Sequence, residues 1–123
     1  MKTKLILLLT LTMFTFACKQ TKNAQKSADT YRLIVSFISK GAGTDATTLA
    51  ALESLLTTFS NRDGFLVKYE KYTWGREGEY DLCFKMEGMK KAKKDEFVKS
   101  VKNCTKSSDL IIIKENAVET HKN

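Results

Sequence analysis

The sequence predicts an α+β domain in which two helices cover one face of an antiparallel four-stranded sheet. Three observations lead to this prediction. Runs rich in β-branched and aromatic residues alternate with two segments whose apolar side chains repeat every three or four positions. Glycines and short polar stretches separate these segments, and proline is absent. The resulting order is strand, helix, strand, strand, helix, strand.

The first strand is expected over residues 31–39, and it ends at a glycine loop, residues 39–45. Its apolar side chains alternate between two faces, with Leu33, Val35 and Phe37 on one and Ile34 and Ile38 on the other. A strand that is apolar on both faces is usually central in its sheet.

The first helix is expected to begin after Thr44 or Asp45, either of which would cap it, and to end near Ser60. Its apolar stripe consists of Leu49, Leu52, Leu56 and Phe59. The stripe predicts that one face of this helix packs on the sheet.

Residues 65–73 and 79–87 are expected to form a hairpin whose turn spans residues 75–78. Pairing position 75 with 78 sets 69 opposite 84. The side chains on one side are then mostly apolar: Phe65, Val67, Tyr69, Leu82, Phe84 and Met86. A slip of one residue would mix apolar and polar side chains, so the pattern selects this register.

A second helix over residues 91–104, beginning as late as Lys93, and a last strand over residues 109–114 complete the order. Two interleaved strand–helix–strand units with a central hairpin predict a ferredoxin-like fold, whose helices both cover one face. Cys104 is expected on the helix-covered side. Cys83 is expected on the open side as a partly exposed thiol, so a disulfide between them is disfavoured.

The sheet face without helices is the candidate binding face. Its residues are Arg32, Ile34, Ile38, Tyr72, Trp74, Arg76, Asp81 and Cys83. Aromatic and arginine side chains anchor many binding surfaces, so a second copy of the chain or another protein is the expected partner. The alternative is a small-ligand binder or an enzyme with a site between this face and the glycine loop.

No catalytic residues, metal ligands or cofactors are predicted. His121 is the only histidine and falls in the C-terminal tail, far along the chain from other candidate groups. The chain is therefore interpreted as a binding module rather than an enzyme.

The first residues have the order of an export signal: Lys2 and Lys4, then an apolar segment from Leu5 to Phe16, then Ala17 and Cys18. The apolar segment is too short to span a bilayer as a mature helix. Cleavage near Ala17 would release a secreted protein in which Cys18 is a free thiol.

Thr15-Phe16-Ala17-Cys18 resembles the lipobox of bacterial lipoprotein signal peptides, although an aliphatic residue is usual where Thr15 stands. The resemblance implies that Cys18 carries acyl chains that hold the protein in a membrane of the cell envelope, facing the periplasm or exterior. Lys19 directly after the cysteine favours the outer membrane by the same resemblance.

The expected organisation is a signal peptide over residues 1–17, a lipidated flexible tether over 18–29, the domain over 30–116 and a polar tail over 117–123. The whole chain has a formal net charge of +7. From Ala28 onward, however, 16 basic side chains face 14 acidic ones. This near balance predicts no nucleic-acid partner.

Overall fold

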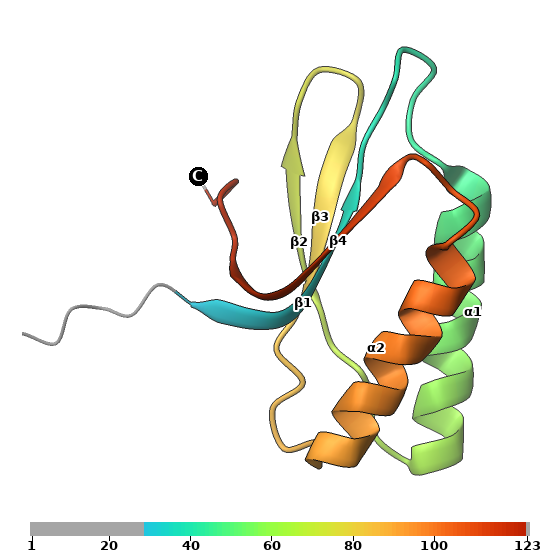
Figure 1. Ribbon diagram of the computed structural model, residues 1–123, viewed down its shortest axis with the longest axis vertical. Helices are drawn as coiled ribbons and strands as arrows, with labels where there is room; N and C mark the ends of the chain where they lie inside the picture. The colour runs from blue at the N-terminus through green and yellow to red at the C-terminus, as the bar shows by residue number, and fades with distance from the viewer. Residues whose placement is uncertain (1–28, 123) are drawn as a thin grey trace, which may run out of the picture.

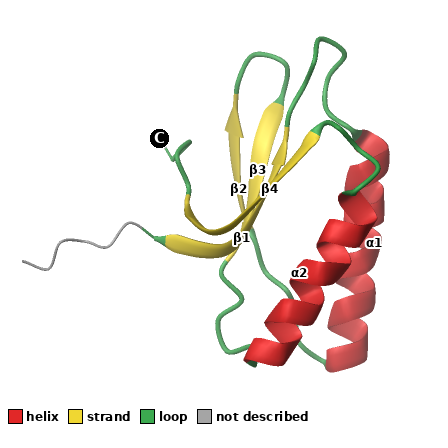
Figure 2. Cartoon of the chain, in the orientation of Figure 1, coloured by secondary structure: helices red, strands yellow, loops and turns green. Residues whose placement is uncertain are grey.

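The computed structural model describes residues 29–122, and they form a sheet covered on one side by two helices (Figure 1, Figure 2). The elements are β1 (Thr30–Phe37), α1 (Ala46–Asp63), β2 (Glu70–Trp74), β3 (Glu79–Phe84), α2 (Lys91–Thr105) and β4 (Ile111–Val118). The sheet is antiparallel throughout, in the order β2-β3-β1-β4. This arrangement confirms the predicted ferredoxin-like fold.

The main core lies between the helices and the sheet. Leu33, Val35 and Phe37 of β1 are fully buried in it, as their alternation predicted. Phe97 of α2 is also fully buried, and its ring centroid lies 5.2 Å from that of Phe59 on α1. Aromatic contacts therefore join the two helices over the sheet. Within the described residues, no helix is both long enough and apolar enough to cross a bilayer.

The α1 helix begins where the sequence predicted but is longer. The Asp45 carboxylate accepts the backbone N–H of Thr48 at 2.9 Å, which is the expected cap. The helix ends at Gly64, whose φ of 62° requires the left-handed region that glycine tolerates. The α2 helix begins at Lys91 rather than near Lys93, because the Lys90 backbone carbonyl accepts the first helical hydrogen bonds.

The hairpin has the predicted register but is shorter than predicted. Glu70 lies opposite Cys83 and Trp74 opposite Glu79, and β3 ends at Phe84. Met86 has a φ of 56°, in the left-handed region, which interrupts the strand and places its side chain in the core. The residues before β2 and after β3 therefore separate instead of pairing.

The last strand is longer than the predicted residues 109–114, since β4 continues to Val118. Asn116 has a φ of 49°, which asparagine tolerates better than most residues. At this end of the sheet, the side chains of β1 and β4 change faces. Tyr31 and Ala117 pack on the side away from the helices, whereas Leu33, two residues after Tyr31, packs beneath the helices.

Phe97→Ala should lower the free energy of unfolding by about 3–5 kcal/mol, because it removes a fully buried ring from the core. Phe65→Ala is a matched control, since the Phe65 side chain is 36% exposed, and it should change stability by less than about 1 kcal/mol. Urea unfolding of both variants measures the difference. Equal losses would contradict the core described above.

Candidate functional site

The C-terminal segment, residues 119–122, folds back across the sheet face opposite the helices (Figure 1). The His121 ring stacks on the Trp74 indole, with centroids 4.4 Å apart and planes 16° from parallel. Glu119 is only 6% exposed. The face that the sequence analysis treated as open is thus partly covered by the chain's own end.

Where this segment meets β3 lies a buried acidic cluster made of Asp81, Cys83, Glu119 and His121. Asp81 and Cys83 come from β3 and are each 1% exposed. The Nδ1 atom of His121 lies 2.6 Å from Asp81 Oδ2 and 3.3 Å from Glu119 Oε1. The second oxygen of Glu119 accepts the Cys83 thiol hydrogen at 3.0 Å.

Contacts within and around the cluster favour the ionised form of Asp81. Burial raises the pKa of Asp81, but nearby polar groups of Ser36, His121 and Trp74 outweigh it, and the net pKa is lowered. No hydrogen bond of ordinary geometry reaches Oδ1 of Asp81 or Nε1 of Trp74 from any residue that the structure describes. Trp74 therefore influences Asp81 without a hydrogen bond of ordinary geometry between them.

The prediction of a partly exposed Cys83 was wrong, because the C-terminal segment covers it. Burial, followed by the hydrogen bond and charge of Glu119, raises the pKa of the Cys83 thiol far above its ordinary value. A thiol that stays protonated is a poor nucleophile. Cys104 packs against the main core, on the other side of the sheet, and both cysteines are free. This confirms the predicted separation of the two sulfurs.

A second polar group, next to the cluster, centres on Glu70 of β2. Its carboxylate accepts the hydroxyl groups of Tyr31 and Tyr72, each at 2.5 Å. These two hydrogen bonds lower the pKa of Glu70 from 4.5 to about 2. The Nζ atom of Lys122 lies 4.9 Å from the centroid of the Tyr31 ring, so the C-terminal segment also contacts this second polar group.

The structure brings together five of the predicted face residues: Ile34, Tyr72, Trp74, Asp81 and Cys83. Ile38 is half-buried just beyond β1, and Arg76 is exposed in the hairpin turn. Arg32 lies apart from them. Its guanidinium lies 3.1 Å from Asp95 of α2 and 2.6 Å from Glu115 of β4, because the faces exchange at this point.

The glycine loop is occupied by contacts within the chain. The Gly41 backbone N–H lies 3.1 Å from the Glu77 carboxylate, which also accepts the Ser39 hydroxyl. The Gly43 N–H donates to Ser39 Oγ at 3.0 Å. The amide groups that an anionic ligand would need are therefore already used, at Gly41 by the hairpin turn and at Gly43 by the loop itself.

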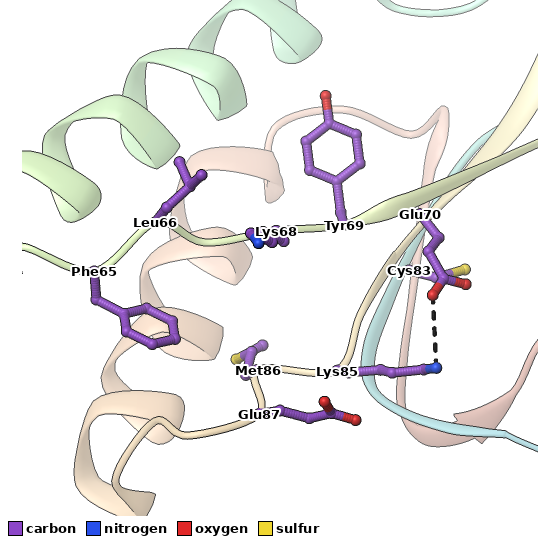
Figure 3. A pocket seen from close by; sticks show the side chains of 9 residues that line it. All are labelled: Phe65, Leu66, Lys68, Tyr69, Glu70, Cys83, Lys85, Met86 and Glu87. Atoms are coloured by element: carbon purple, nitrogen blue, oxygen red, sulfur yellow. Dashed lines mark ion pairs between the residues drawn. The ribbon is translucent and has the colours of Figure 1, made fainter.

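Where the hairpin strands separate, a groove of about 620 Å³ opens, named here the β2–β3 groove (Figure 3). Phe65, Leu66 and Tyr69 are exposed along it by 36%, 66% and 41%. Its lining residues are Phe65, Leu66, Lys68, Tyr69, Glu70, Cys83, Lys85, Met86 and Glu87. Figure 3 shows them on two chain segments that run on either side of the groove, linked at one end by the Glu70–Lys85 ion pair.

Sequence reasoning missed both the buried acidic cluster and the groove. His121 is 40 residues from Asp81 along the chain, and no local spacing indicates their contact. The signal that could have found the groove is the run Phe65-Leu66, which breaks the alternation of apolar and polar residues in the predicted strand.

Stability should fall as the pH drops from 4.5 toward 2, because the lowered pKa of Glu70 means that its ionised form is favoured in the folded state. Glu70→Gln should reduce the slope of the unfolding free energy against pH over this range, by an amount that corresponds to at most about one proton. Unfolding in urea at a series of pH values measures it. Glu53→Gln, an exposed carboxylate on α1, serves as the control and should keep the original slope.

Comparisons with protein-family models, with curated proteins and with solved structures gave no match. The geometry of the chain itself is therefore the basis for assigning a function. That geometry offers two features: a charged cluster closed by the C-terminal segment and an exposed apolar groove beside it.

Proposed function

We propose that this chain is a lipid-anchored binding module of a bacterial cell envelope, and that its β2–β3 groove takes an apolar segment of another polypeptide. The observation that carries the proposal is the exposure of three large apolar side chains, Phe65, Leu66 and Tyr69, along one groove. Apolar side chains gathered at a concave surface are typical of interaction sites. Through Glu70, Cys83 and Lys85 the groove reaches the face opposite the helices.

The groove's charges favour a polypeptide over other partners. Lys68 and Lys85 are matched by Glu70 and Glu87, so its rim carries both signs. A rim of mixed charge around an apolar centre is the usual composition of a protein interface. An anionic lipid or nucleic acid would favour a rim of basic residues alone.

The proposed location follows from the leader. Cys18 lies outside the described residues, and the resemblance of its surroundings to a lipobox supports acylation at this position. Acyl chains on Cys18 would hold the domain at the membrane surface, with the outer membrane favoured by Lys19. The near balance of charge from Ala28 onward supports a protein partner at that surface.

The groove can be tested with a photo-crosslinking amino acid in place of Leu66, using Ile112 as the matched control position. Ile112 is 44% exposed, similar in character, and lies on β4 at the opposite edge of the sheet. We expect one defined crosslinked product from position 66 and none from position 112. The mass of the product tells whether the partner is a second copy or another envelope polypeptide.

The partner so identified should then bind the purified chain, and Leu66→Asp should weaken that binding by about tenfold or more, since a charge is costly in an apolar groove. Ile112→Asp should leave the affinity unchanged. Identical crosslinks from both positions, or an affinity that Leu66→Asp does not alter, would rule out the groove as the binding site.

Cys18→Ser should move the protein from the membrane fraction to the soluble fraction of cells, because it removes the atom to which the acyl chains attach. Cys104→Ser is the matched control and should remain with the membrane. Mass spectrometry of the mature N-terminus gives a direct measurement. A wild-type protein that begins with an unmodified thiol would contradict the anchor.

A further inference from the structure

Three side chains able to ligate a metal ion converge in the buried acidic cluster. Asp81 comes from β3, whereas Glu119 and His121 come from the C-terminal segment, and one ligand atom from each lies within 4.8 Å of the others. Two of these residues, Asp81 and Glu119, are almost fully buried. The cluster therefore joins the end of the chain to a central strand of the sheet.

The cluster brings two buried carboxylates together at a single imidazole. Two buried carboxylates carry two negative charges when ionised, and burying such charges is costly unless they are balanced. Among the described residues, the His121 ring is the group that faces both Asp81 and Glu119. A divalent ion held by the three side chains would balance both carboxylates.

The other oxygen of the Asp81 carboxylate also favours a metal site. Oδ1 of Asp81 is buried and receives no hydrogen bond of ordinary geometry from the described part of the chain, where Ser36 and the Trp74 indole are the neighbouring polar groups. Buried acceptors are nearly always satisfied in folded proteins. The other oxygen of this carboxylate, Oδ2, already lies beside His121 Nδ1. A metal ion bound by both oxygens would therefore also satisfy Oδ1.

The surroundings of the ligands suit a metal of the zinc type. Calcium and magnesium prefer all-oxygen sites, whereas zinc accepts imidazole nitrogen together with carboxylate oxygen. Zinc bonds of 2.0–2.2 Å in tetrahedral geometry place ligand atoms roughly 3.3 Å apart. The distance from His121 Nδ1 to Glu119 Oε1 is 3.3 Å, and the 2.6 Å to Asp81 needs only a small widening.

Cys83 would orient one ligand without being one of the three. Its thiol donates to Oε2 of Glu119, which leaves Oε1 directed at His121. Hydrogen bonds of this kind position the ligands of many metal sites. The His121 side chain is 33% exposed, so an ion can enter from solvent and a water molecule can complete the coordination.

We infer that Asp81, Glu119 and His121 form a site for a divalent transition-metal ion of the zinc type, which fastens the C-terminal segment to the sheet. This site is additional to the binding role of the groove. Trp74 reports on it, since the indole stacks on the ligand His121 and is the only tryptophan of the chain.

The test uses the untagged full chain, purified in detergent and stripped of metal with a chelator. Zinc should bind with a stoichiometry of one per chain by calorimetry, and Trp74 emission should change until one equivalent is added. Cobalt(II) should give the visible absorption of a four-coordinate ion. His121→Ala should weaken zinc binding by about 100-fold or more, since loss of a ligand costs at least as much as loss of an outer partner.

Glu119→Gln keeps the size of the side chain and should weaken binding similarly, which separates loss of a ligand from loss of packing. Glu115→Gln is the matched control, because this carboxylate lies near the end of β4 but pairs with Arg32 and Lys102 outside the cluster. It should bind zinc as the wild type does. A wild-type chain that binds no zinc, or unchanged affinity in His121→Ala and Glu119→Gln, would overturn the inference and leave the groove proposal unaffected.

Discussion

The buried carboxylate of Asp81 is the constraint on which the helix-free side of the molecule depends. Asp81 lies on β3, between two other strands, so backbone pairing fixes it in place, and Ser36 and Trp74 of those strands help to keep it ionised. His121 reaches the same carboxylate from the end of the chain. In doing so it brings Glu119 over Cys83 and places its own ring on Trp74. One buried charge thus explains why the last residues are ordered against the sheet rather than extended into solvent.

The two sides of the sheet are built on different principles. Beneath the helices, Phe97 and its aromatic neighbours pack as an apolar core, where shape and burial dominate. On the opposite side, Tyr31, Glu70 and Tyr72 form a hydrogen-bonded group beside a small apolar cluster. Polar networks of this kind specify one arrangement more narrowly than apolar packing does. The groove opens at the junction of these two environments, where neither the core nor the network continues.

The sequence was sufficient for the order of elements, the layer arrangement and the hairpin register, because each depends on local periodicity. Alternation in β1 and in the hairpin correctly identified the side chains that pack beneath the helices, but not the burial of Cys83 on the other face. The ends of strands were harder to predict. Met86 and Asn116 adopt left-handed backbone conformations, which shorten β3 and redirect β4. The pattern of apolar residues does not predict such conformations. The buried acidic cluster was out of reach for a different reason: Asp81 and His121 meet only after the whole sheet has formed. The local spacing of residues along the chain does not predict long-range contacts between polar side chains.

The two ends of the described chain meet, and this has a consequence for how the sequence could be rearranged. Lys122 lies 3.0 Å from Asp29, so the polypeptide enters and leaves the domain at one place. Neighbouring ends permit circular permutation, in which a short linker joins them and new ends are opened elsewhere. The turn between β2 and β3 is the natural point for such an opening, since residues 75–78 are exposed. A permuted protein would begin and end at the opposite end of the sheet, with the same strands and helices in a new order.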